Sequence, residues 1–207
     1  MTDPRTPAGT DPAIDLRALD AQALDRRAIV IALDAARLVR PDQWELPTPC
    51  EGWNLRDLLG HMVAENRGFI AAAAGATDLR VWRDASLGAD PWVDFADSAV
   101  GVTAALSGPE VLERHLFIRE FGTFPGSVAI AMHFLDNLVH AWDVARTIGL
   151  PGNIDPELAL CALAFAEPWE LGRPGIAFGG AVEPPVDPTP GERLLALLGR
   201  TPHRRSA

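Results

Sequence analysis

Apolar residues along this chain recur at intervals of three and four, which is the period of one buried face of an α-helix. The first run extends from about Leu16 to Val39, and its apolar stripe consists of Leu24, Ala28, Ile31, Ala35 and Leu38. Comparable runs predict further helices over 54–75, 91–107, 127–149, 155–172 and 191–199. The pattern therefore predicts an all-α protein in which four long helices precede a shorter helical segment.

Residues with strong local preferences mark the ends of these helices. Asn54 is a good N-cap, and Asp57 places a negative charge in the first turn, where the helix dipole favours it. We expect Ser127 to cap the fourth long helix, and Asp155-Pro156 to open the fifth. The three prolines between 41 and 49 predict an extended connection after the first helix.

Two regions depart from the helical period. Residues 113–124 are typical of a short strand or a hairpin, closed by Pro125-Gly126. Residues 172–190 are rich in glycine and proline, which predicts irregular structure. We expect residues 1–15 to be a mobile tail, 16–150 to form the bundle, and 151–207 to form a C-terminal helical extension packed on it.

Charge and composition narrow the classes of function. The 207 residues carry a formal net charge of −10, which argues against binding to nucleic acid or to an anionic membrane surface. No apolar stretch reaches the roughly 18 residues of a membrane span, and the N-terminus lacks an apolar signal core, so we expect a cytoplasmic protein. The two cysteines, Cys50 and Cys161, make no disulfide framework and are expected to be free thiols.

Three side chains on two apolar helices suggest a metal site. His61 lies on the second helix, and Asp136 and His140 are one turn apart on the fourth, so both can reach one point. Two imidazoles and a carboxylate can hold a divalent metal and leave one coordination position open. Imidazole suits zinc, nickel and iron alike, so this pattern alone does not select the metal.

Neighbouring residues leave alternatives open. Glu65 repeats the i, i+4 relation with His61 and is a candidate fourth ligand or general base. His133 lies about 10 Å from His140 along the axis, so we do not expect it to share the ion; it is a candidate either for orienting Asp136 or for acid–base catalysis. Cys50 precedes a helix N-terminus, a position that favours thiol reactivity, although a packed loop residue is the more common case. A histidine satisfied within a purely structural core is the alternative to any metal site.

The same residues carry a family resemblance. Residues 48–61 (TPCEGWNLRDLLGH) and 138–149 (LVHAWDVARTIG) resemble the segments around the second and fourth helices of mycothiol-dependent maleylpyruvate isomerase-like proteins, within the DinB-like superfamily. Residues 121–126 resemble the turn before the fourth helix of that family. Residues 177–179 and 193–200 are similar to the closing segments of an actinobacterial subgroup. The resemblance covers about 20–200.

This resemblance implies both a fold and a chemistry. The fold would be a DinB-like up-and-down four-helix bundle with a small β-hairpin and a C-terminal helical extension. The ligands of a divalent metal, most often zinc, would be His61, Asp136 and His140. Mycothiol would be the cosubstrate. The reaction would be either the transfer of a thiol to a small electrophile or the isomerisation of that electrophile. The isomerase pattern has glutamate where this chain has Asp136. A non-catalytic metal-binding or regulatory bundle is the alternative, and bundles of this type often form homodimers.

Overall fold

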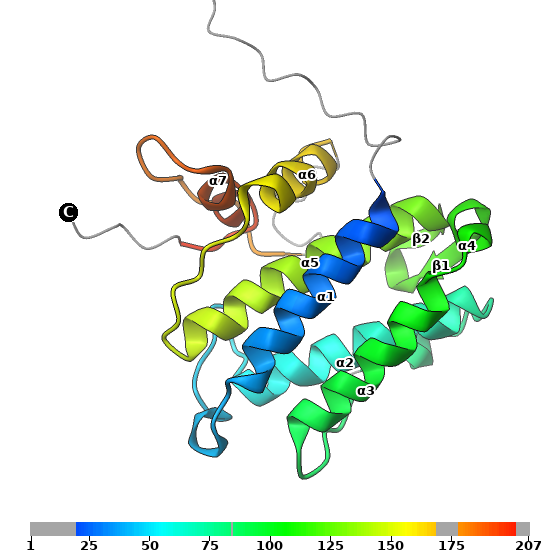
Figure 1. Ribbon diagram of the computed structural model, residues 1–207, viewed down its shortest axis with the longest axis horizontal. Coiled ribbons are helices and arrows are strands. Elements are labelled where there is room, and N and C mark those ends of the chain that lie inside the picture. The colour runs from blue at the N-terminus through cyan, green and yellow to red at the C-terminus, as the bar shows by residue number, and fades with distance from the viewer. Residues whose placement is uncertain (1–19, 84, 169–177, 202–207) are drawn as a thin grey trace, which may run out of the picture.

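Four long helices form the body of the protein (Figure 1). The computed structural model describes residues 20–83, 85–168 and 178–201. The bundle consists of α1 (Ala21–Arg37), α2 (Leu55–Ala73), α3 (Pro91–Leu106) and α5 (Gly126–Thr147). Helix α1 packs mainly along α5, and α2 packs mainly along α3. The all-α four-helix bundle predicted from the sequence is therefore confirmed.

Side-chain caps explain where several of these helices begin. The Asn54 side chain accepts a hydrogen bond from the Asp57 backbone N–H at 2.8 Å, and the Asp57 carboxylate accepts one from the Asn54 N–H at 3.1 Å. This reciprocal pair satisfies two N–H groups that the first turn of α2 leaves free. The carboxylate of Asp20 caps α1 in the same way through Ala23 N–H, at 2.9 Å.

The predicted hairpin is present, but its turn lies elsewhere. Strands β1 (His115–Ile118) and β2 (Gly122–Pro125) pair antiparallel, and a 3₁₀ turn over Arg119–Phe121 joins them. Pro125 therefore ends β2 rather than closing the hairpin. Arg119 adopts a positive φ of 42° within this turn, a conformation that few non-glycine residues take.

The start of α5 also differs from the prediction. Helix α5 begins at Gly126, so Ser127 lies inside the helix instead of capping it. A short helix missed by the sequence pattern, α4 (Pro109–Glu113), explains this start. The Gly126 N–H donates to the Arg114 carbonyl at 2.7 Å, and a Cβ on Gly126 would lie 1.7 Å from the Val111 carbonyl oxygen. The close approach of α4 thus requires glycine here.

The C-terminal segment packs on the bundle through α6 (Pro156–Ala166) and α7 (Pro190–Leu197). Apolar side chains of both helices share one core cluster with α1 and α5. Helix α6 ends about five residues before the expected 171–172. The predicted tail over 1–15, residues 172–177 of the irregular segment, and the C-terminal 202–207 lie outside the described residues.

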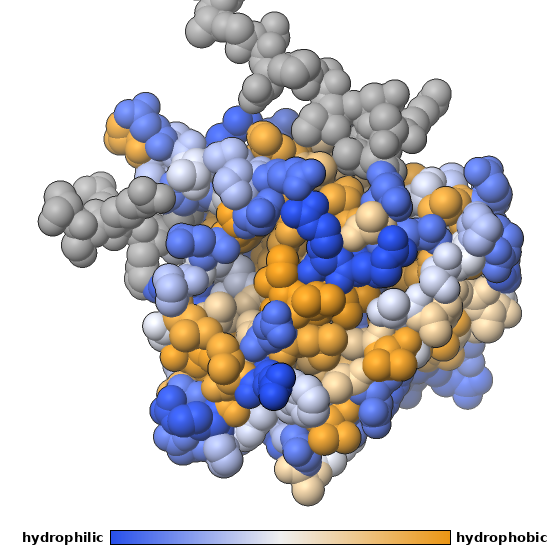
Figure 2. Space-filling view, in the orientation of Figure 1, coloured by the Kyte–Doolittle hydropathy of each residue, from blue (hydrophilic) through white to orange (hydrophobic). Residues whose placement is uncertain are grey.

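Three of the five residues in the stripe predicted for the first helix, Leu24, Ala28 and Ala35, are buried, and the other two are not. Ile29 and Ala32 are buried, whereas Ile31 is 39% exposed and Leu38 is 58% exposed. Apolar side chains accordingly gather on the surface over α1 and α3 in Figure 2. The expected extended connection after α1 contains a short 3₁₀ turn, η1 (Pro41–Gln43), and another, η2 (Leu79–Trp82), follows α2. No described helix has the length and hydropathy needed to cross a membrane.

Candidate metal centre

Two helices of the bundle bring the three predicted ligands together. His61 projects from α2, and Asp136 and His140 project from α5. Oδ1 of Asp136 lies 3.3 Å from Nε2 of His140 and 3.7 Å from Nε2 of His61. The two imidazole rings stand edge to face, with centroids 5.1 Å apart. All three side chains therefore point at one volume between α2 and α5.

The donor atoms fit a single ion of ordinary size. One ligand atom from each of the three residues lies within 4.8 Å of the others. Tetrahedral zinc with bonds of about 2.0–2.1 Å sets its ligand atoms roughly 3.3 Å apart, so small side-chain rotations are sufficient. Within the described residues, Oδ2 of Asp136 is buried and has no hydrogen-bond partner. A buried carboxylate oxygen without a donor is costly, and a cation at this point would satisfy it.

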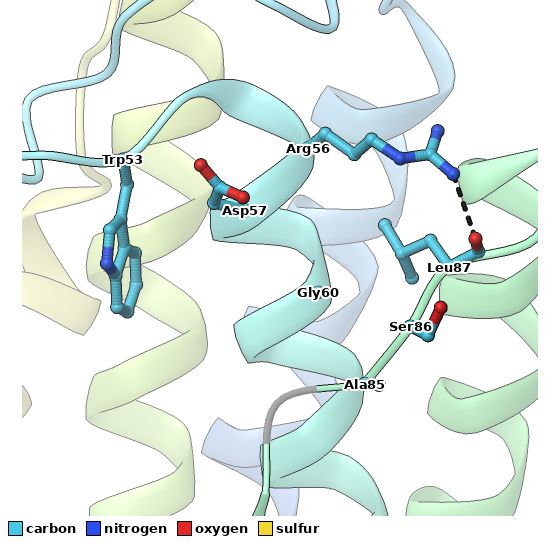
Figure 3. Close-up of a pocket in the computed structure, with 7 residues that line it drawn as sticks. All are labelled: Trp53, Arg56, Asp57, Gly60, Ala85, Ser86 and Leu87. Carbon is cyan, nitrogen blue, oxygen red and sulfur yellow. Dashed lines mark hydrogen bonds between the residues drawn. The ribbon is translucent and has the colours of Figure 1, made fainter.

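The three candidate ligands line a cavity of about 620 Å³. Its walls come from the loop before α2, the hairpin turn, and the segments 178–180 and 199–200. Trp53 packs against the His61 ring, with centroids 4.9 Å apart. A second cavity of about 370 Å³ lies next to it, with Trp53 in both walls. Figure 3 shows that this second cavity follows the outer side of α2, where Arg56 donates to the Leu87 carbonyl at 2.8 Å.

The pKa values of His140 and Asp136 are shifted in opposite directions. Burial disfavours protonation of His140, but the carboxylates of Asp136 and Asp143 outweigh it and raise the pKa of His140 well above its usual value. Burial likewise opposes ionisation of Asp136, yet His140 and His61 hold the pKa of that carboxyl well below its usual range. Asp136 is therefore ionised at neutral pH, the form that binds a metal, whereas His140 must give up a proton before it can bind one.

On the side of His140 away from Asp136, Asp143 contacts the imidazole ring and Arg200 contacts Asp143. Nδ1 of His140 is 2.9 Å from Oδ2 of Asp143, which is fully buried. A carboxylate in this position fixes the tautomer and the orientation of a ligating imidazole. Arg200 holds Asp143 in turn, with Nη2 at 2.7 Å from Oδ2 and Nε at 3.2 Å from Oδ1. The sequence prediction assigned no role to Asp143 or Arg200.

His140 also belongs to an alternative donor group with Cys50 and Asp143. Nη2 of Arg200 lies within hydrogen-bond distance of both other members, at 3.3 Å from the Cys50 sulfur and 2.7 Å from Asp143. A guanidinium in this position already supplies the positive charge that a metal would bring. The geometry therefore favours the cavity side of His140, with His61 and Asp136, as the metal position.

Glu65 lies beside the three ligands, next to His61. Its Oε1 lies 3.8 Å from Nδ1 of His61 and accepts a hydrogen bond of 2.5 Å from Arg119 in the hairpin turn. Burial, followed by the charge of Asp136, raises the pKa of Glu65 from 4.5 to about 7, although His61 and Arg119 oppose the shift. The carboxyl group can therefore gain or lose a proton near neutral pH.

His133 belongs to a different cluster from the one that the spacing suggested. Its Nδ1 lies 2.7 Å from Asp25 on α1, and its Nε2 lies 2.9 Å from Oδ1 of Asn66 on α2. Asn66 donates to Ser98 on α3 at 2.9 Å. These four residues join all four long helices in one buried chain of hydrogen bonds. Both ring nitrogens are thus engaged away from Asp136, so the expected orienting contact to Asp136 is absent from the described hydrogen bonds.

Comparison with known proteins places this architecture in a family. The sequence model described as "Mycothiol maleylpyruvate isomerase N-terminal domain" matches residues 26–145, more than half of the chain. The chain belongs to this family. The matched segment of this family member contains most of α1, all of α2, α3 and the hairpin, and most of α5, and therefore all three candidate ligands.

This family member is also similar to two bacterial proteins, and it shares its fold with two solved structures. Uncharacterized proteins from two strains of Mycobacterium tuberculosis, CDC 1551 and H37Rv, are each 34% identical over 168 residues, covering 79% of this chain and 88% of theirs. Two crystal structures of mycothiol-dependent maleylpyruvate isomerase, one of them a mutant, share the fold with TM-scores of 0.54 and 0.57. Their identities are 18% and 16%, and each match covers 72% of this chain and 68% of the other.

Proposed function

We propose that this protein binds a divalent metal, with zinc as the first candidate, through His61, Asp136 and His140. We also propose that it uses mycothiol in one of two reactions, either the transfer of a thiol to a small electrophile or the isomerisation of that electrophile. The observation that carries the proposal is the convergence of the three donors at one wall of the 620 Å³ cavity, where a buried Asp136 oxygen has no donor among the described residues. Membership of the mycothiol maleylpyruvate isomerase family supports the choice of thiol.

The residues around the metal position have separable tasks. A zinc ion with three protein ligands supplies an open coordination position and lowers the pKa of a thiol bound there. Asp143 holds the His140 ring in place, and Arg200 holds Asp143. Glu65 lies in the wall of the same cavity, 3.8 Å from His61, and is the group that we propose to exchange a proton with the electrophile.

The length of the carboxylate side chain at position 136 limits which substrate can be assigned to this protein. Aspartate reaches one methylene less far than the glutamate of the isomerase pattern, so α5 must lie closer to the ion. We therefore assign to this chain thiol chemistry on a small electrophile, without assigning maleylpyruvate as the substrate. We also propose that residues 16–150 form the metal-binding unit and that 151–207 complete the cavity wall through 178–180 and 199–200.

Thiol-dependent turnover is the direct test. The zinc-loaded protein is incubated with mycothiol and a panel of small electrophiles, and conjugates and isomers are quantified by mass spectrometry. We expect turnover that requires both metal and thiol, that is lost in His61→Ala, and that persists in His115→Ala. His115 is the matched control because it is exposed on β1. Full metal loading without any turnover across the panel would favour the non-catalytic bundle instead.

A further inference from the structure

Aromatic rings lie next to both imidazoles of the candidate metal centre. The Trp53 ring packs on His61 with centroids 4.9 Å apart, and the His140 ring follows at 5.1 Å from His61. The Phe178 ring lies beyond His140, with centroids 6.1 Å apart, and the Arg200 guanidinium lies over it, 5.3 Å from the ring centroid. Trp53 and Phe178 therefore end a chain of four neighbouring rings in the wall of the 620 Å³ cavity.

A third aromatic side chain, Phe121, reaches the same cavity from the hairpin turn. The three aromatic residues thus come from separate parts of the chain: the loop before α2, the turn between β1 and β2, and the segment before α7. All three are half-buried, so each keeps part of its ring accessible. Aromatic rings bury a large apolar area and pack well against other planar groups. This wall therefore fits a planar unsaturated or aromatic group.

The arginines of the cavity wall are already engaged by carboxylates. The chain contains no lysine, and the described residues of the wall include two arginines, Arg119 and Arg200. Arg119 pairs with Glu65, and its Nε also lies 3.5 Å from the carboxylate of Glu120. Arg200 pairs with the buried Asp143 at 2.7 Å. Neither guanidinium is therefore free to receive the carboxylate or phosphate group of a ligand.

Acidic side chains add to this bias. Glu51 and Glu120 are exposed and line the cavity, and both imidazoles of the candidate centre face the carboxylate of Asp136. An anionic ligand would lose its hydration next to like charges, and a charge buried without a partner is costly. The open coordination position of a bound metal would not receive it either, because the proposed function gives that position to the thiol.

We propose that the electrophile accepted by this cavity is an uncharged molecule with a planar unsaturated or aromatic body, which packs against Trp53, Phe121 and Phe178. The aromatic rings select the planar body, and the acidic side chains with the engaged arginines discriminate against carboxylates and phosphates. This inference rests on the proposed function for the reaction that the bound molecule undergoes. The preference in binding belongs to the side chains of this protein and is measurable without metal or thiol.

The test compares nitrobenzene with 4-nitrobenzoate, two unreactive probes that share a ring and differ by one carboxylate. Ligand-observed NMR titration of metal-free protein measures both affinities, and the absence of zinc prevents direct capture of the carboxylate. We expect nitrobenzene to bind at least about tenfold more tightly. Trp53→Leu and Phe178→Leu should each weaken nitrobenzene binding at least about threefold. Trp44→Leu should leave it unchanged, because Trp44 is half-buried in the same core cluster as Trp53 but is not among the described residues of the cavity wall.

A change of charge at the cavity tests the discrimination against anions. Glu120→Lys places a cation beside the cavity and should reduce the preference for nitrobenzene over 4-nitrobenzoate at least about threefold. Glu110→Lys makes the same change of charge at an exposed position on α4, outside the described cavity wall, and should leave the preference unchanged. Circular dichroism confirms that each variant is folded.

Four results would overturn the proposal. Nitrobenzene could fail to bind the folded wild-type protein, or 4-nitrobenzoate could bind as tightly. The Trp53→Leu and Phe178→Leu variants could bind nitrobenzene as tightly as wild type, or Glu120→Lys could have no more effect than Glu110→Lys. None of these outcomes depends on turnover, so a protein with the expected binding preference but no thiol-dependent activity would refute only the proposed function.

Discussion

Helix α5 presents two histidines, seven residues apart on nearly one face, with opposite surroundings. His133 is fully buried, and Asp25 and Asn66 engage its two ring nitrogens. His140 is engaged on one side by Asp143, but its other nitrogen faces Asp136 and the cavity. Asp136 in turn has a buried oxygen without a donor among the described residues. We call the first group, His133 with Asp25, Asn66 and Ser98, the closed cluster, because protein partners satisfy it. We call the second group, His61, Asp136 and His140, the open cluster.

The difference shows that one histidine of α5 serves the packing of the helices, whereas the other serves the candidate site. A closed polar chain that joins α1, α2, α3 and α5 fixes how the helices pack, because every member depends on a partner from another helix. An open cluster keeps ligand atoms free at the cost of an unsatisfied carboxylate. The closed cluster therefore positions the two helices on which the open cluster lies.

The largest effect on stability should come from the closed cluster. His133→Ala leaves the buried Asp25 carboxylate without its partner, and breaking a buried pair in this way costs about 3–5 kcal/mol. Urea denaturation of the two proteins measures this loss. His61→Ala is the comparison from the open cluster, where we expect a change within about 1 kcal/mol. Similar losses in the two variants would remove the distinction between closed and open clusters.

Glu65→Gln should change how stability depends on pH. The pKa of Glu65 in the folded protein is about 7, above its ordinary 4.5, so between these values the folded protein binds more protons than the unfolded chain. Stability therefore falls as pH rises through this window, by at most about 3 kcal/mol, and the glutamine variant should lack this component.

Urea denaturation of the metal-free proteins at pH 5 and pH 8 checks this prediction. Asp136→Asn should also reduce the slope, because the charge of Asp136 contributes to the raised pKa of Glu65. The same slope in wild type and Glu65→Gln would show that Glu65 is ionised throughout, and would remove it as a proton-exchanging group.

Asp143→Asn should lower the metal affinity of the open cluster without abolishing metal binding. The amide keeps the shape of the side chain but holds the His140 ring less firmly, and changes at such outer partners typically cost 10–100-fold in metal affinity. Competition with a chromophoric zinc chelator measures the affinity. Thr147→Ala is a suitable control, since its hydroxyl bonds only the backbone carbonyl of Asp143. Equal affinities in wild type and Asp143→Asn would mean that the carboxylate has no part in orienting His140.

The smallest effect is expected at the rim of the open cluster. Arg119 is 27% exposed and pairs with Glu65, so Arg119→Ala should cost no more than about 1 kcal/mol. Its positive charge lowers the pKa of Glu65, so its removal should raise that pKa further. Titration of the Glu65 carboxyl by NMR in both proteins detects the shift, and a downward shift would contradict the ion pair.

Sequence periodicity was enough to predict the long helices, because a helix depends on local spacing. The i, i+4 relation alone places Asp136 and His140 together. Local pattern fails where a contact crosses the fold. Asp25 lies 108 residues from His133, and Arg200 lies 57 residues from Asp143, so nothing in the spacing joins them. The same limit explains Gly126, whose helix start depends on contact with Val111.

Asp143 is a partner of His140 that helical spacing could have revealed. It follows His140 by three residues, which places both side chains on one face of α5. Ile31 on α1 and Leu38 at its C-cap, both solvent-facing, were misassigned to the buried face for the complementary reason. A three-and-four spacing is satisfied by two adjacent stripes on a helix, and only packing on α5 and α3 decides which of them is buried.

Zinc titration of chelator-stripped protein by isothermal calorimetry tests the central claim most directly. We predict one zinc per chain, with affinity reduced by more than about 100-fold in His61→Ala and in Asp136→Asn, and unchanged in His115→Ala and Cys50→Ser. Unchanged binding in both His61→Ala and Asp136→Asn would contradict the account. If Cys50→Ser lost binding as well, the metal would lie on the Asp143 side of His140, and the open cluster would not be a metal site.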